Sequence, residues 1–348
     1  MKKMIAVLLA LTLVFTLAAC SSSAPDPGSS DASQPSSSTA DNSSTESTAT
    51  ADGEGYDIVF IPKGVADFWS IVSGGFEQAA KDAGMTPRVV YPDKEEASRQ
   101  VEVMYDVINS KPDAIVLSPV AAEALIAPCQ AAQEAGIPVI LVDTLISSDD
   151  YVCAFATNNV TAGALAADEM AKRINNEGKV HIFAGSPAST SNVDRVKGFT
   201  DRMAEAYPDI EVIGTLYSEA DINLCTTQAV DVITANPDIK GMFAVDETRT
   251  SGVGTALTQL GKEGEIIVGG FDSNPDSAEL MRNGTVQFLT VQQPYQMGYQ
   301  GFEAAVKTLN GEELAHETVD TGCTVVPAEK MEEEEMQRLL FPLDYIGQ

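Results

Sequence analysis

From Tyr56 onward, short runs of branched apolar residues alternate with longer amphipathic segments. The apolar runs are typified by DIVFI, AIVL and PVILV in the first part and by VHIFA, GMFAV, IIVGG and VQFLTV in the second. The 3.6-residue periodicity predicts helices at 68–83, 95–109, 121–135, 160–175, 192–207, 222–236, 248–260, 276–283 and 294–310. Strands that alternate with helices of this length are typical of parallel-sheet units. The pattern therefore predicts an α/β fold of the doubly wound kind.

Two helix ends carry glycines that support these boundaries. Gly84 closes KDAG and Gly136 closes QEAG, and a predicted strand follows each of them. Glycine adopts the left-handed conformation that ends many helices without a steric cost. We therefore expect a positive φ angle at both positions.

A faint internal repeat indicates that the fold contains two similar lobes. The stretches NSKPDAIVLSP and TANPDIKGMFAVD both run from a helix through a Pro-Asp turn into an apolar strand with a polar stop. The stops are Ser118 and Asp246. Duplication predicts that these two residues occupy equivalent places in the two lobes.

The N-terminus has the layout of an export signal, in which Lys2 and Lys3 precede an apolar run from Met4 to Leu17. The run ends in Leu-Ala-Ala-Cys, which resembles the lipobox of bacterial lipoproteins, so residues 1–20 are predicted to be a lipoprotein signal with Cys20 as the lipidated residue. A single-span anchor is the alternative, but it needs about 20 apolar residues, and this run is shorter. We expect a protein anchored to the outer face of the cell membrane, or to its periplasmic side if an outer membrane exists.

The next segment, residues 21–55, has no aromatic residue and consists mainly of Ser, Thr, Ala, Pro, Asp and Gly. Such a segment cannot bury enough apolar surface to offset its ordering entropy, so it is predicted to be a disordered tether. The remaining chain is long enough for two ordinary domains with a sizeable core.

Charge and cysteine content exclude several classes of partner. The formal net charge is −30, from 51 acidic and 21 basic residues, which disfavours nucleic acid and anionic lipid surfaces. Membrane contact is therefore expected through the lipid anchor only.

The remaining cysteines lie far apart without a C-x-x-C motif, and only two histidines accompany them, so no metal site or other cofactor is expected. They are predicted to be unpaired buried thiols, with one disulfide as the alternative that export allows, and they are Cys129, Cys153, Cys225 and Cys323.

In open parallel sheets, ligands bind beyond the carboxyl ends of the strands, because successive loops converge there. The residues that follow the predicted strands combine carboxylates, an amide, cations and aromatic rings. This set suits a sugar, whose hydroxyl groups need planar acceptors and donors and whose C–H faces need flat apolar surfaces. The candidate ligand-binding residues are Lys63, Phe68, Trp69, Ser118, Asp143, Arg195, Asp246, Phe271, Asp272 and Gln292.

The charges of this set also constrain the ligand. Three or four carboxylates against Lys63 and Arg195 leave the proposed cleft neutral to slightly negative. Such a cleft favours a neutral sugar or polyol and disfavours a phosphate or dicarboxylate.

Structural roles compete with ligand binding at several of these positions. Phe68 and Trp69 have the alternative of plugging the core, and Arg195 has the alternative of an exposed helix position. Asp143 and Asp272 have the alternative of helix caps or turn residues. The helix dipole alone would favour the acidic pair Asp246-Glu247, so Glu247 is left out of the candidate set.

Six short motifs, in order, resemble the ribose-type sugar-binding proteins of bacterial ABC importers, which are type I periplasmic binding proteins. They are IPKGVADFW, GIPVILVD, ATNNVTAG, the Arg195-x-x-Gly198-Phe199 step, VGGFDSNPD and VQQPYQMGYQG. The likeness runs from about Tyr56 to Pro327. It implies two lobes, 56–157 plus 293–320 and 158–292 plus 321–340, which close on a sugar. It also implies a three-strand hinge, with crossings near Thr157, Gln292 and residues 320–322.

The resemblance assigns roles to the candidate residues. Phe68 and Trp69 match the family's stacking pair, and Ser118 and Asp143 match its polar contacts in the first lobe. The contacts of the second lobe and the hinge are matched by Arg195, Asp246, Asp272 and Gln292.

The chain also departs from the ribose binders. They have Asn where Asp246 stands, Arg where Thr144 stands, and Asn near Ala66. These departures argue against ribose itself. A lysine at the position of Lys63 resembles the relatives that bind deoxyhexoses or furanosyl signals.

No enzyme signature accompanies these motifs. The sequence has no phosphate loop, no G-x-S-x-G elbow and no H-E-x-x-H helix. We therefore expect a monomeric receptor that captures a pentose, hexose or deoxyhexose and hands it to an ABC permease. The alternatives are a receptor of the same fold that signals to a membrane kinase, and a surface glycosidase that uses two of the carboxylates.

Overall fold

The computed structural model describes residues 55–345, so the predicted signal peptide, Cys20 and all of the predicted tether except Gly55 lie outside the described residues. The first of two six-stranded sheets has the order β11-β5-β4-β3-β1-β2, and all of its strand pairs are parallel. Its strands are β1 (Ile58–Ile61), β2 (Arg88–Val89), β3 (Ala114–Leu117), β4 (Val139–Val142), β5 (Ala154–Ala156) and β11 (Thr318–Asp320).

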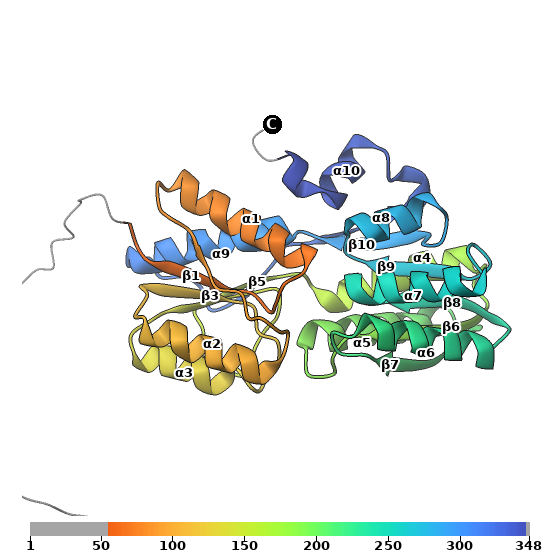
Figure 1. Cartoon of the computed structure of the whole chain (residues 1–348), viewed down its shortest axis with the longest axis horizontal. Helices are drawn as coiled ribbons and strands as arrows, with labels where there is room; N and C mark the ends of the chain where they lie inside the picture. Colours follow the sequence, from red (N-terminus) through yellow and green to blue (C-terminus); the bar gives the residue numbers. More distant parts are fainter. Residues whose placement is uncertain (1–54, 346–348) are drawn as a thin grey trace, which may run out of the picture. The chain divides into compact units, whose positions relative to one another are not determined.

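Helices cover both faces of this first sheet, and together they form the first lobe (Figure 1). One face carries α1 (Asp67–Asp82) and α9 (Pro294–Leu309), and the other carries α2 (Ala97–Asn109) and α3 (Ile126–Glu134). The central strands β1, β3 and β4 are fully buried apolar runs, as expected when helices cover both faces of a parallel sheet.

The second sheet repeats this arrangement, with the order β12-β10-β9-β8-β6-β7. Its strands are β6 (Gly178–Ala184), β7 (Ile210–Tyr217), β8 (Ile239–Ala244), β9 (Ile267–Phe271), β10 (Phe288–Gln292) and β12 (Cys323–Pro327). The edge strand β12 pairs antiparallel with β10, whereas the other pairs are parallel. The sheet is therefore mixed, as is common for an open sheet with one late edge strand.

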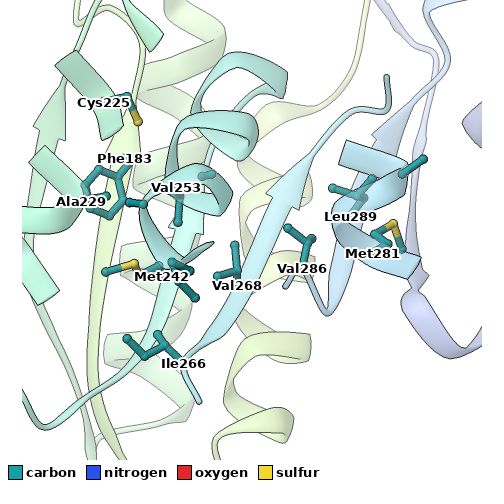
Figure 2. Packing of buried hydrophobic residues seen from close by; sticks show 14 of the residues in the cluster. Phe183, Cys225, Ala229, Met242, Val253, Ile266, Val268, Met281, Val286 and Leu289 are labelled. Atoms are coloured by element: carbon teal, nitrogen blue, oxygen red, sulfur yellow. The ribbon is translucent and has the colours of Figure 1, made fainter. Parts of the chain in front are cut away.

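The second lobe consists of this sheet and the helices that cover its faces. One face carries α4 (Asn159–Arg173) and α5 (Thr190–Ala206), and the other carries α6 (Ile222–Ala235), α7 (Glu247–Leu260), α8 (Pro275–Arg282) and α10 (Glu334–Leu340). Figure 2 shows side chains of α6, α7 and α8, such as Ala229, Val253 and Met281, packed against strand residues. Two short 3-10 helices, η1 (Ala328–Lys330) and η2 (Pro342–Tyr345), lie before and after α10.

The chain passes between the two sheets at three places, which lie after Ala156, after Gln292 and after Asp320. The crossings implied by the sequence lie at the same positions. The α/β fold with two doubly wound lobes and a three-strand hinge is thereby confirmed, apart from the antiparallel direction of β12.

The helix predictions are accurate to within two residues at each end, with one exception. The helix predicted from residue 121 begins only at Ile126, as α3. The preceding loop is held by the buried side chain of Gln100, which donates to the carbonyls of Pro62 and Ser118 and accepts the N–H of Val120. Within 121–125, the N–H of Ala122 donates to the carbonyl of Ala188, and the carbonyl of Ala122 accepts the N–H of Ser147. These bonds satisfy backbone groups outside a helix, so the apolar pattern alone is misleading here.

Both predicted left-handed glycines are confirmed, with φ angles of 70° at Gly84 and 79° at Gly136. Within residues 55–345, none of the helices combines the length and the apolar character needed to cross a bilayer.

Candidate ligand-binding site

A pocket lies where the carboxyl ends of strands from both sheets meet, and it encloses about 720 Å³ of empty space, part of it open to solvent. Eight of the ten predicted residues line it, namely Lys63, Phe68, Trp69, Asp143, Arg195, Asp246, Asp272 and Gln292.

The other two predicted residues lie directly behind the pocket wall. Ser118 is fully buried, and its hydroxyl donates to the Asp143 carboxylate over 3.4 Å. Phe271 is also fully buried, and its ring lies 3.7 Å from the guanidinium carbon of Arg195. Both support a wall residue and have no surface on the pocket.

Lys63 and Asp143 form a buried ion pair in the wall of the first lobe. The Lys63 Nζ lies 2.8 Å from Asp143 Oδ2 and donates to Thr144 Oγ1 over 2.6 Å, while Thr144 donates to Asp143 over 2.7 Å. Burial opposes ionisation of Asp143, but the attraction of Lys63 and Arg195 outweighs it and lowers the pKa of this carboxyl. Asp143 is therefore a charged acceptor, and Lys63, Asp143 and Thr144 each contact the other two.

Asp143 and Asp272 are matching residues of the two lobes. Asp143 follows β4 and Asp272 follows β9, and their φ angles are 66° and 58°, in the left-handed region that few residues other than glycine adopt. In each case the backbone N–H donates over 2.9 Å to a neighbouring strand, at Phe155 and Thr290 respectively. Strained conformations of this kind concentrate at functional sites.

The predicted equivalence of Ser118 and Asp246 is wrong by one residue. The N–H of Ser118 donates to the carbonyl of Ile61 after β3, and the matching bond after β8 comes from Val245, which donates to Phe183. The residue that matches Ser118 is therefore Val245, and Asp246 lies one position further along, where it caps α7.

Arg195 is held rigidly in the second lobe, so the alternative of an exposed helix position is wrong. The residue is 3% exposed. Its Nε donates to Asn159 and its Nη1 to the carbonyl of Val245, both over 2.7 Å. A second contact of Nη1, 3.9 Å from Asp272, turns the guanidinium toward the pocket. Asn159, which the sequence analysis did not identify, fixes this orientation.

Asp272 and Gln292 form the hinge side of the pocket. Gln292 Nε2 donates to Asp272 Oδ2 over 2.9 Å. Burial raises the pKa of Asp272 to about 6, although Arg195 and Gln292 oppose this shift. Among residues 55–345, Gln292 Oε1 has no hydrogen-bond partner, although it is buried. A buried acceptor without a partner is costly, so this oxygen is suited to a ligand hydroxyl.

Capping explains Asp246 but not Asp272. Asp246 is the N-cap of α7, where it accepts the N–H of Arg249, and it also pairs with the guanidinium of Arg249 at 2.6 and 2.7 Å. The helix after Asp272 is capped by Asn274, which forms a reciprocal capping box with Ser277. Arg249 thus occupies much of the acceptor capacity of Asp246. The sequence analysis did not identify Arg249, because an Asp and an Arg at i,i+3 spacing are typical of an exposed helix pair.

Glu247 lines the pocket although it was left out of the candidate set. It is the first residue of α7, and its Oε2 accepts the backbone N–H of Phe68 from the other lobe over 3.2 Å. Burial, followed by repulsion from Asp272, Asp67 and Asp246, raises the pKa of Glu247 to about 8. Its position directly after the polar stop of β8 was the available sequence signal.

Phe68 and Trp69 belong to both the core and the pocket. They are the second and third residues of α1, are 7% and 5% exposed, and pack edge to face with ring centroids 4.8 Å apart. Lys63 Nζ lies 5.4 Å from the centroid of Trp69. The two alternatives of core packing and pocket lining are therefore compatible for these rings.

The described cysteines are free thiols, so the alternative of one disulfide among them is wrong. Cys129, Cys153 and Cys225 are buried, and Cys323 is half-buried. Burial raises the pKa of each thiol, to about 11 or about 12. Over residues 55–345, no group of three or more His, Cys, Asp or Glu side chains is arranged to hold a metal ion.

Two lobes of this topology, with a polar and aromatic pocket between their strand ends, define a solute-binding protein of the type that closes on its ligand. Residues 58–313 match the periplasmic binding protein domain family, and the chain belongs to that family. The family acts outside the cytoplasm.

Curated relatives narrow the class. The chain is 26% identical to the ribose import binding protein of Salmonella typhimurium, over 71% of this chain and 82% of that protein. It is also 26% identical to the D-allose-binding periplasmic protein of Escherichia coli, over 69% and 79% of the two chains.

Solved structures agree with these relatives. A carbohydrate transporter solute binding protein of Agrobacterium radiobacter, solved with D-arabinose, has a TM-score of 0.79 at 30% identity and covers 82% of this chain and 98% of its own. An ABC transporter solute binding protein of Agrobacterium vitis, solved with D-fucose, has a TM-score of 0.77 at 32% identity, with 82% and 99% covered. The resemblance to ribose-type sugar-binding proteins is thus confirmed. The chain is a binding protein and not an enzyme, so the glycosidase alternative is set aside.

Proposed function

We propose that this protein captures a small neutral sugar, a pentose, hexose or deoxyhexose, by closure of its two lobes and delivers it to an ABC permease. The observation that carries the proposal is the composition of the pocket wall. Buried acceptors and two fixed guanidinium groups face the same space as two aromatic rings of the first lobe. Charge-assisted hydrogen bonds from sugar hydroxyls to such groups contribute about 1.5–3 kcal/mol each.

The ion pairs of the wall favour a neutral ligand. Lys63 is paired with Asp143, and Arg249 is paired with Asp246, so neither cation is left for a ligand anion. Additional carboxylates line the same pocket at Glu247 and Asp272. A phosphate or a dicarboxylate would therefore meet a surplus of negative charge.

Closure of the two lobes around the sugar is the proposed mechanism of binding. We assign residues 56–157 plus 293–320 to the first lobe and residues 158–292 plus 321–340 to the second. Polar contacts already join them, because Ala122 N–H donates to Ala188 O over 3.1 Å and the Thr144 and Ser191 hydroxyls lie 3.4 Å apart. A sugar that contacts both lobes favours the closed state, since only that state offers it all of the contacts.

We further propose that the mature protein is a monomer that starts at a lipidated Cys20 and is tethered to the outer face of the membrane through residues 21–55. Replacing Cys20 with Ala removes the acyl chains while leaving the binding lobes unchanged. The expected result is release of the protein from the membrane fraction and loss of fatty-acid labelling. A variant that remains in the membrane fraction would contradict the lipid anchor and favour the single-span alternative.

A thermal-shift panel of pentoses, hexoses, deoxyhexoses and polyols tests the sugar assignment. A ligand at about 100 times its Kd adds about 2.7 kcal/mol to the free energy of unfolding. This corresponds to a rise in Tm of several degrees for lobes of this size. Sugar phosphates and dicarboxylates are the controls, and a larger shift with them would refute the neutral-sugar assignment. NMR of the recovered ligand should show an unchanged sugar.

A further inference from the structure

Glu247 is a pocket carboxylate that makes one hydrogen bond across the lobes and has no ion-pair partner among the described residues. Asp143 and Asp246 each pair with a cation at less than 3 Å, whereas Glu247 has no salt bridge within residues 55–345. Its Oε2 accepts the N–H of Phe68, at the start of α1 in the opposite lobe. Its other oxygen, Oε1, makes no hydrogen bond within this part of the chain, and the residue lines the pocket.

The groups that face Glu247 are acidic on every side. Asp67 comes from α1, Asp272 from the end of β9, and Asp246 from the residue before α7. Burial and these three carboxylates disfavour a charged Glu247 and raise its pKa to about 8.

The cations of the pocket are engaged elsewhere. Lys63 is bound to Asp143 and Thr144, and Arg249 to Asp246. Arg195 donates to Asn159 and to a backbone carbonyl. None of these three side chains is positioned to stabilise a charged Glu247.

We propose that Glu247 is a specificity-determining residue that acts as an uncharged carboxylic acid, with one oxygen holding Phe68 N–H across the lobes and the other donating its proton to an oxygen of the sugar. The inference rests on the proposed function and names a chemical requirement of the ligand. The sugar presents an acceptor oxygen to Glu247, either a ring oxygen or a hydroxyl. An ammonium group at that point offers donors only, so an amino sugar that places it there is disfavoured.

Two variants separate this role from a charged or purely structural one. In Glu247→Gln, the amide keeps an acceptor for Phe68 N–H and a donor for the sugar, but it has no charge to gain or lose. In Glu247→Ala, both bonds are lost. The probe is the tightest binder among D-ribose, D-arabinose, D-fucose and D-galactose, measured by isothermal titration calorimetry on the whole mature chain.

At about pH 7 we expect Glu247→Gln to bind within about threefold of the wild type and Glu247→Ala to bind at least about tenfold more weakly. The affinity of the wild type should fall above about pH 8, by about tenfold for each further pH unit, because the ionised form cannot donate. The affinity of Glu247→Gln should stay flat to about pH 9.5. Circular dichroism and Tm at each pH show whether the variants are folded.

The pH window separates Glu247 from Asp272 and Cys323, and the comparison with Glu247→Gln separates it from Glu95, a lining residue whose pKa burial also raises. The carboxyl of Asp272, with a pKa raised to about 6, is ionised before the window begins, and the thiol of Cys323, with a pKa raised to about 11, is protonated throughout it. A decline in affinity over this range that disappears in Glu247→Gln therefore belongs to Glu247.

Three outcomes would overturn the inference. If Glu247→Gln binds as weakly as Glu247→Ala while the wild type is unaffected by pH, Glu247 works as a charged carboxylate. If, as a second outcome, D-galactosamine binds more tightly than D-galactose, the excess negative charge of the pocket stabilises a cationic ligand. In both cases the wild type still binds a sugar, so the proposed function stands; if the wild type binds none of the probes and no sugar shifts its Tm, both proposals fail together.

Discussion

At the level of single residues, the polar groups of the pocket wall hold one another in place before any ligand arrives. Lys63 and Asp143 form one such pair, with side-chain exposures of only 7% and 4%. Each is costly to bury alone, and together with Thr144 they satisfy much of their hydrogen-bonding capacity. The first wall of the pocket is therefore preorganised by an ion pair that also supports the fold.

Lys63→Met should destabilise the protein by about 3–5 kcal/mol at neutral pH, because it leaves Asp143 buried without a cation. The lowered pKa of Asp143 contributes stability that is present above the unfolded value of about 3.9 and is lost as the pH falls through the folded value. The loss caused by Lys63→Met should therefore shrink as the pH approaches about 3 to 4. Urea unfolding at both pH values measures it.

The matched control is Lys179→Met, which breaks the surface pair of Lys179 with Asp238, where the side-chain exposures are 35% and 63%. It should cost far less than Lys63→Met, because solvent screens an exposed pair. Equal losses from the two variants would show that burial of the Lys63 pair has no energetic importance.

At the level of elements, each lobe contains one pair of helices that cross at backbone contact. In the first lobe, a Cβ added at Gly75 of α1 would lie 2.0 Å from the carbonyl oxygen of Tyr295 of α9. In the second lobe, a Cβ at Gly163 of α4 would lie 2.2 Å from the carbonyl oxygen of Arg195 of α5. These approaches leave no room for a side chain, so the second crossing fixes the backbone of Arg195, whose side chain Asn159 and Val245 then orient.

Gly75→Ala should destabilise the first lobe by about 1–3 kcal/mol, because the methyl group would overlap a backbone atom that cannot move aside. Gly74→Ala in the same helix is the control, since the added methyl group meets only the end of the Leu343 side chain, at 2.6 Å. There, the gain in helix propensity of up to about 1 kcal/mol offsets a small rearrangement. Urea unfolding of the two variants compares them, and equal stabilities would refute the close crossing of α1 and α9.

The sequence predicts elements well where a local pattern specifies them, and poorly where a distant partner decides. The stripe that contains Met297 and Phe302 identifies α9, whose start at Pro294 and end near Asn310 are also local signals. The loop before Ile126 is irregular because distant groups bind its backbone, namely the side chain of Gln100 and the backbone of Ala188 and Ser147. No pattern within that loop carries this information.

The same distinction applies to the site. Strand ends locate Asp143 and Asp272 from the sequence, because parallel strands place their carboxyl ends at one edge. The pairing of Asp246 with Arg249 and the bond from Phe68 to Glu247 depend on how side chains turn after the chain has folded. The candidate residues are thus predictable, whereas their partners and protonation states require the structure.

At the level of the whole molecule, a fourth connection accompanies the three crossing segments. After β12, the chain continues through α10 and η2, and Leu340 is buried in the core of the second lobe at 1% exposure. Three residues later, Leu343 reaches Gly74 on α1 of the first lobe. The C-terminal segment 334–345 therefore contacts both lobes, outside the pocket and beyond the end of the matched family domain.

Leu343→Asp should weaken sugar binding, because it removes an apolar contact that is made across the lobes and so favours the open state. Loss of about 1–2 kcal/mol of apolar burial shifts a two-state equilibrium by about 5- to 30-fold. Small-angle scattering should show a larger radius of gyration than the wild type without sugar and the same radius with saturating sugar.

Leu224→Asp is the matched control, since Leu224 on α6 is 43% exposed against 39% for Leu343, and it should leave both the radius and the affinity unchanged. If Leu343→Asp lowers only the Tm, the C-terminal segment stabilises the fold without influencing closure, and the energetics of the hinge belong to the three crossing strands alone.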